Sequence, residues 1–161
     1  MTLIAILTRL DGRISRKPFW IGTLVLTLGF IAGFAAIIAV LGEVAFSGPY
    51  SGNNGATLAL GTLTLVASIP VMLKRLHDLN YSYRLLVPLF ILEALALAGD
   101  IAGWSGNETD LNTFGWALLA VYGLYALALM VFMGFYRGTR GHNDFGPDPL
   151  APEEIPATVS L

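Results

Sequence analysis

The chain has 161 residues, of which 55% are hydrophobic and only 12% are charged. A soluble domain usually carries about 25% charged residues, so this composition indicates that lipid is the solvent of most of the chain. Cysteine is absent, which excludes disulfides and thiol chemistry. Because apolar runs fill most of the length, we expect one small membrane domain and no second, soluble domain.

The first 18 residues are predicted to form a cytoplasmic segment at the membrane interface. Apolar residues recur at helical spacing over residues 1–10, a stretch too short to span, so a brief amphipathic helix is expected there. The following DGRISRKPFW ends on the first long apolar run. Ser15 is the expected cap of that run's helix, and Pro18 suits its first turn.

Four apolar runs follow, and we predict a transmembrane helix for each. A helix needs roughly 20 residues to cross a hydrocarbon core of about 30 Å. The first run is also too long for the apolar part of a cleaved signal, about 7–15 residues. Pro70 lies near the charged end of the second run and predicts a kink. The expected spans are residues 19–42, 56–73, 85–104 and 114–136, within a domain covering 19–149, with loops at 43–55 and 105–113 and a disordered tail at 150–161.

The basic residues predict the orientation. All nine lie before the first run, between the second and third, or after the fourth: Arg9, Arg13, Arg16, Lys17, Lys74, Arg75, Arg84, Arg137 and Arg140. The charged residues of the two opposite loops are all acidic, namely Glu43, Glu108 and Asp110. Lysine and arginine accumulate on the cytoplasmic side of membranes. The sequence therefore predicts an all-α protein with four transmembrane helices and with both termini in the cytoplasm.

Three polar motifs are expected on that cytoplasmic face: GRISRKPFW before the first span, RLHDLNYS after the second and GTRGHNDFGPDP after the fourth. Together they resemble the bacterial membrane family called domain of unknown function 805, whose pattern is GR-x-SR-x-x-F/W-W, RLHD-x-G/N-x-S and G-x-x-G-x-N-x-F/Y-G-x-DP. Arg84 and His142 depart from the residues expected in that pattern. The resemblance implies four spans and an inner-membrane location, and it implies no activity.

The favoured interpretation of these motifs is structural. Arg75 is expected to pair with Asp78, Asp144 or Asp11 and so to hold the turn and the tail under the helices, because an Arg–carboxylate pair fixes geometry well. The whole expected interaction cluster consists of Asp11, Arg13, Arg16, Arg75, His77, Asp78, Asn143, Asp144 and Asp148.

Two other interpretations stay open. One is a basic shelf that binds anionic lipid headgroups, formed by Arg13, Arg16, Lys17, Lys74, Arg75 and Arg140. The other is a metal site that uses His77 and His142 with Asp78 and Asp144, although their spacing fits no zinc pattern. We expect no metal and no other cofactor. Ser15 and Ser82 have no evident base, and phosphate-loop and dinucleotide fingerprints are missing, so no enzyme is expected.

Within the expected third span, Glu93 and Asp100 need an explanation. They lie seven residues apart and so on nearly one face of a helix. Intramembrane carboxylates are functional candidates. We interpret the pair as a packing contact whose polar atoms are satisfied, and a proton or cation path is the alternative. Two G-x-x-x-G motifs, Gly29–Gly33 and Gly99–Gly103, indicate close helix packing, within the bundle or with a partner.

The function expected from these features is that of an accessory or scaffolding subunit of the bacterial inner membrane. It would bind membrane lipids, a larger membrane-protein complex or further copies of itself, and no nucleic acid. The alternative is a small oligomeric transporter or ion-conducting module that uses Glu93 and Asp100.

Overall fold

The computed structural model describes residues 2–42, 55–106 and 111–151, and within these ranges the chain is all-helical, without a strand. The elements are α1 (Leu3–Thr8), α2 (Arg16–Leu41), α3 (Gly55–Asp78), the short 3₁₀ helix η2 (Tyr83–Leu85), α4 (Val87–Ala102) and α5 (Thr113–Phe135). The all-α prediction is confirmed for the described residues.

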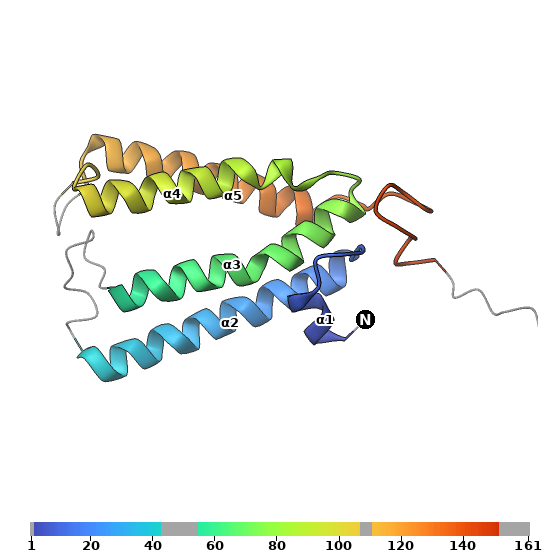
Figure 1. Cartoon of the computed structure of the whole chain (residues 1–161), viewed down its shortest axis with the longest axis horizontal. Coiled ribbons are helices and arrows are strands. Elements are labelled where there is room, and N and C mark those ends of the chain that lie inside the picture. Colours follow the sequence, from blue (N-terminus) through green and yellow to red (C-terminus); the bar gives the residue numbers. More distant parts are fainter. Residues whose placement is uncertain (1, 43–54, 107–110, 152–161) are drawn as a thin grey trace, which may run out of the picture.

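The long helices form two pairs. α2 packs mainly on α3, and α4 packs mainly on α5 (Figure 1). The pairs lie close together at the end where α3 and α5 finish and where α1 is placed, and they diverge toward the other end (Figure 1). The three polar motifs all lie at the end where the pairs meet.

Side chains at the helix ends explain where several helices begin. The Thr2 hydroxyl accepts a hydrogen bond from the amide of Ala5 at the start of α1 (3.3 Å). Asn112 caps α5 by accepting from the amide of Gly115 (2.9 Å), and its side-chain amide donates to the Trp104 carbonyl just beyond α4 (2.7 Å). Ser15 takes the predicted position before α2, but its side chain makes no capping hydrogen bond.

Among the helices of the described ranges, three are long and apolar enough to cross a membrane, namely α2, α3 and α5. The predicted span at 85–104 is corrected by the structure, because α4 has 16 residues and not 20. At 1.5 Å per residue, a helix of that length covers about 24 Å of a core of roughly 30 Å. Pro88 suits the first turn of a helix, and Gly103 has a left-handed φ of 71° that ends one.

The sequence predicted a kink at Pro70 and close helix packing at two G-x-x-x-G motifs. α3 continues through Pro70, and Figure 1 shows that it bends along its length. Of the predicted G-x-x-x-G positions, Gly33 is a close helix contact, because a Cβ there would lie 2.9 Å from a Leu60 methyl group. Gly29 and Gly103 face open space, and Gly99 lies against Ser105, where α4 ends.

The best-packed apolar side chains lie toward the end that carries the motifs. The buried set is Ile6, Ile14, Phe19, Val71, Leu76, Leu79, Leu86, Leu89, Leu129 and Met133. Many apolar side chains elsewhere on the long helices are exposed, as expected for helices whose outer surface faces lipid. The predictions for the loops at 43–55 and 105–113 and for the tail at 150–161 fall largely on residues outside the described ranges.

Candidate functional site

A buried ion cluster joins the first two motifs. Asp78, the last residue of α3, receives the Arg13 guanidinium on Oδ1 (3.1 Å) and the Arg75 guanidinium on Oδ2. The two arginine side chains are 1% and 0% exposed, and that of Asp78 is 4% exposed. Two positive groups thus share one carboxylate, and their other N–H groups need acceptors.

The C-terminus of α5 supplies acceptors for Arg75. The last carbonyls of a helix have no partner within it and carry partial negative charge. Arg75 Nε donates to the Met133 carbonyl (2.6 Å), and Arg75 Nη2 donates to that of Tyr136. The carbonyls of Gly134 and Phe135 accept hydrogen bonds from two side chains of α2. Trp20 Nε1 donates to Gly134 (3.2 Å), and Arg16 Nη1 donates to Phe135 (3.5 Å).

Lys74 donates hydrogen bonds to carbonyls of α1 in the same way. Its buried Nζ donates to the carbonyls of Ala5 (2.5 Å) and Ile6 (2.8 Å). The Lys74 carbonyl in turn accepts from the amide of Ile14 (3.3 Å). Basic residues from which the sequence predicts a cytoplasmic face therefore act here as caps of helix C-termini.

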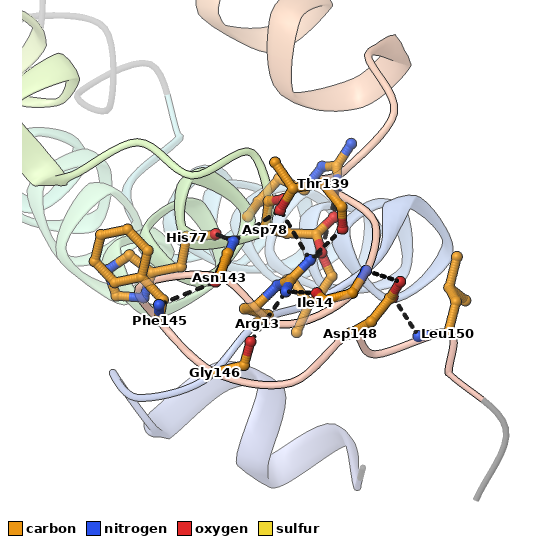
Figure 2. A network of polar contacts seen from close by, with 12 residues as sticks. Arg13, Ile14, His77, Asp78, Thr139, Asn143, Phe145, Gly146, Asp148 and Leu150 are labelled. Carbon is orange, nitrogen blue, oxygen red and sulfur yellow. Dashed lines mark hydrogen bonds and ion pairs between the residues drawn. The ribbon is translucent and has the colours of Figure 1, made fainter.

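Arg13 connects this cluster to the C-terminal segment. Its Nη1 donates to the carbonyls of Gly141 (2.8 Å) and Gly146 (3.0 Å), and its Nη2 donates to that of Thr139 (2.6 Å). Figure 2 shows the Arg13 side chain enclosed by this segment, with Asp78 beside it. One side chain from before α2 thus holds the chain that follows α5.

The C-terminal segment also contacts the end of α3 directly. Asn143 Nδ2 donates to the His77 carbonyl (2.8 Å), and the Thr139 amide donates to the Asp78 carbonyl (2.8 Å). The His77 ring stacks on Phe145 with a centroid separation of 4.0 Å (Figure 2). These contacts fold the third motif back over the second.

Asp148 shapes the last turn of the described segment. Its carboxylate accepts from the amides of Leu150 (2.9 Å) and Gly141 (3.0 Å). These two hydrogen bonds hold the pKa of this carboxyl below its usual value, because they stabilise the charged form.

The structure brings together seven of the nine residues predicted for the cluster: Arg13, Arg16, Arg75, His77, Asp78, Asn143 and Asp148. Of the three carboxylates proposed for Arg75, the one it contacts is Asp78. Asp11 and Asp144 are exposed and stand apart from these contacts.

The residues considered for a metal do not meet. His142 is exposed, whereas His77 Nδ1 lies 3.2 Å from the Gly12 carbonyl. In the part of the chain that is described, no three histidine or acidic side chains gather closely enough to hold a metal ion.

Three residues that contribute to the cluster were not predicted from the sequence: Trp20, Thr139 and Gly138. Trp20 caps α5, and Thr139 accepts from Arg13 and Asn143. At Gly138 an added Cβ would collide with the Asp78 carboxylate. The repeated glycines of GTRG were the available signal for a close approach, since such spacing is typical of a backbone that must pass near another group.

An open cavity of about 630 Å³ lies beside the ion cluster. Arg16, Arg137 and Arg140 are exposed and line it, with Asp148 on the same rim. The predicted basic shelf is therefore divided, because Arg13, Lys74 and Arg75 are buried and already hydrogen-bonded.

Two further cavities lie between the helix pairs. An apolar groove of about 370 Å³ is lined from all four long helices, by residues that include Thr23, Ser68, Leu89 and Ala126. A cavity of about 200 Å³ is lined by Glu93 of α4 and by Thr57 and Thr62 of α3. Glu93 also interacts with Tyr122 of α5. Asp100 lies in α4, but its side chain is outside what the structure describes.

Three long apolar helices joined at one end by a polar cluster define the class as a multi-pass membrane protein. The family described as protein of unknown function (DUF805) matches residues 7–147, and the chain belongs to this family. No curated protein and no solved structure matches the chain. The family match covers the first two motifs and all but the last two residues of the third, so the resemblance inferred from them is confirmed.

Proposed function

We propose that this protein is a non-enzymatic accessory or scaffolding subunit of the bacterial inner membrane, and that it binds lipids or other membrane proteins. The side chains best suited to chemistry, such as Arg13, Arg75 and Asp78, already have several hydrogen-bond partners. They would have to break the contacts that join the helices before they could act on a substrate.

Four crossings with both termini in the cytoplasm are part of this proposal. α5 begins beside the end of α4, where Asn112 donates to the Trp104 carbonyl. Near the middle of α5, the Tyr125 hydroxyl donates to the Leu85 carbonyl, ahead of α4 (2.7 Å). α4 and η2 therefore run beside α5, and this supports a fourth crossing at α4, although α4 has only 16 residues.

The observation that carries the functional proposal is the apolar groove between the helix pairs. Each pair makes most of its contacts within itself, and the groove of about 370 Å³ between them is lined almost wholly by apolar surface. In a membrane such a groove must be filled by a lipid chain or by another helix, because dispersion contacts are lost in an empty cavity.

The test is purification in mild detergent followed by mass spectrometry of the intact assembly. Ala126→Trp would fill the groove, and Leu124→Trp, on an exposed position of the same helix, is the matched control. We expect a copurifying protein or a tightly held lipid that Ala126→Trp removes and Leu124→Trp retains. Consistent absence of both in the wild type would count decisively against the proposal.

A second candidate is a small oligomeric transporter or ion-conducting module. It is favoured by the cavity that Glu93 lines together with Thr57 and Thr62. A carboxylate within a membrane is a functional candidate. Flux of protons or cations in proteoliposomes should fall in Glu93→Gln and persist in Glu43→Gln, whose residue lies in a predicted loop. Unchanged flux in Glu93→Gln would remove this candidate.

A further inference from the structure

We infer that the open cavity beside the ion cluster binds a phosphate group through Arg16, Arg137 and Arg140, and that the natural bearer is the headgroup of an anionic phospholipid. The inference deepens the proposed function, on which it rests, by naming a ligand class and the residues that hold it.

The charge of the cavity is the first argument. Its lining holds four guanidinium groups, of Arg16, Arg75, Arg137 and Arg140, against the carboxylates of Asp78 and Asp148, a net charge of +2. Asp78 is already shared by Arg13 and Arg75. Within the described residues, Arg16, Arg137 and Arg140 have no carboxylate at ion-pair distance, so their positive charge is available to a ligand.

The start of α2 gives an independent argument. Ser15 and Arg16 line the cavity, and they mark the N-terminus of a helix of 26 residues. The first amides of a helix have no intrahelical partner, and its N-terminus carries partial positive charge. The Ser15 side chain does not cap them, so the helix end adds to the attraction that the three arginines exert on an anion.

The geometry of guanidinium groups favours phosphate over a simple halide. Arginine presents a planar fork of donors that matches phosphate oxygens, and several arginines can bind one phosphate from different sides. The three exposed arginines of the cavity come from two separate places in the chain, the first residue of α2 and the segment after α5.

The position along the helices favours a lipid as the source. Arg16 is the first residue of α2, and Arg137 directly follows Tyr136, the C-cap of α5. Both therefore stand where apolar helices end, which is the depth of lipid headgroups in a bilayer. Basic residues at this depth attract anionic lipid.

Asp148 is the opposing group on the rim. Its carboxylate accepts from two backbone amides, of Gly141 and Leu150, so much of its charge is turned toward the chain. It would repel an anion that entered from its side and would restrict a phosphate to the part of the cavity near the arginines.

The experiment measures lipid retention by the purified protein in mild detergent, with phosphatidylglycerol and phosphatidylcholine as competing probes. Arg137→Gln/Arg140→Gln should lower the preference for phosphatidylglycerol roughly tenfold, since each basic residue contributes to attraction of anionic lipid. The matched control is Lys17→Gln/Arg84→Gln, which removes the same charge from exposed residues that do not line the cavity. The control should keep the preference.

A second arm adds inorganic phosphate to the wild type. Displacement of phosphatidylglycerol only at high phosphate concentration supports the lipid as ligand, whereas tight binding of inorganic phosphate alone would overturn the assignment of a lipid. Equal losses in the two double variants, or no preference in the wild type, would overturn the site itself. Mass spectrometry of the same purified assemblies detects the retained lipid and any copurifying protein. Loss of the lipid site and failure of the accessory-subunit proposal are therefore seen separately.

Discussion

Asp78 balances two buried positive groups, and this makes it the most sensitive residue of the cluster. Its oxygens are divided between Arg13 and Arg75, and its carbonyl accepts the Thr139 amide. Removal of one partner from a buried ion cluster costs more than the cluster contributes in total, because the remaining charges stay buried without compensation.

Asp78→Asn should therefore destabilise the folded protein by about 3–5 kcal/mol. The free energy of unfolding is measured by reversible unfolding in detergent, monitored by circular dichroism. Asp144→Asn is the control, since Asp144 is exposed and outside the cluster, and a surface change of this kind stays within about 0.5 kcal/mol. Similar stability of both variants would show that Asp78 is not the electrostatic centre of the cluster.

Asp148 makes the order of the C-terminal segment depend on pH. Its two backbone hydrogen bonds lower the pKa of the folded state, so the folded carboxyl takes up a proton less readily than the unfolded one. The stabilisation is present above the usual value of 3.8 and is lost as the pH falls through the lower pKa of the folded state. Hydrogen exchange at the Gly141 and Leu150 amides, corrected for intrinsic rates, should accelerate below about pH 4. In Asp148→Asn it should already be fast at neutral pH; equal protection of the two proteins would rule out this role.

At the scale of the helix, the close approach of α2 to α3 depends on which glycine of the G-x-x-x-G motif faces the neighbour. A Cβ at Gly33 would meet Leu60 of α3, and a Cβ at Gly29 would meet nothing within 4 Å. Gly33→Ile should push the helices apart and destabilise by about 1–3 kcal/mol, as overpacked sites do. Gly29→Ile makes the same change in helix propensity without the clash. The thermal stability of the two variants should therefore differ, and equal values would contradict this helix contact.

The helices themselves could be predicted from apolar runs, but two kinds of detail could not. The start and the end of α4 depend on local backbone chemistry at Pro88 and at Gly103, and α4 is therefore shorter than the apolar run predicted. The caps of α5 depend on residues far away in the chain. Arg75 reaches Met133 across 58 positions and Arg16 reaches Phe135 across 119, and no local pattern encodes such pairings. The motifs did predict that Arg75 pairs with Asp78, Asp144 or Asp11, and the structure shows the pair with Asp78, the only one of the three that is close to Arg75 in the sequence.

At the scale of the whole molecule, the polar cluster acts on the relative position of the helix pairs. Arg75 of α3 and Trp20 of α2 bind carbonyls at the end of α5, so the first pair is attached to the second at one end. Toward the other end the pairs diverge (Figure 1). The arrangement therefore places a firmly packed end beside the charged residues and leaves an apolar groove between the helices.

This arrangement predicts which ends of the helices share a side of the membrane. Tyr83 and His142 follow α3 and α5 at the joined end, while Thr113 begins α5 at the opposite end. The chain has no cysteine, so single cysteines at these three exposed positions can be labelled without background. With four crossings and cytoplasmic termini, a membrane-impermeant maleimide should label Thr113→Cys in cells with a permeable outer membrane. It should reach Tyr83→Cys and His142→Cys only after the inner membrane is opened. If α4 does not cross, Tyr83→Cys and Thr113→Cys will be labelled alike. Labelling of Tyr83→Cys and His142→Cys in intact cells, without labelling of Thr113→Cys, would place the arginine-lined cavity on the outer face, away from the side on which basic residues accumulate.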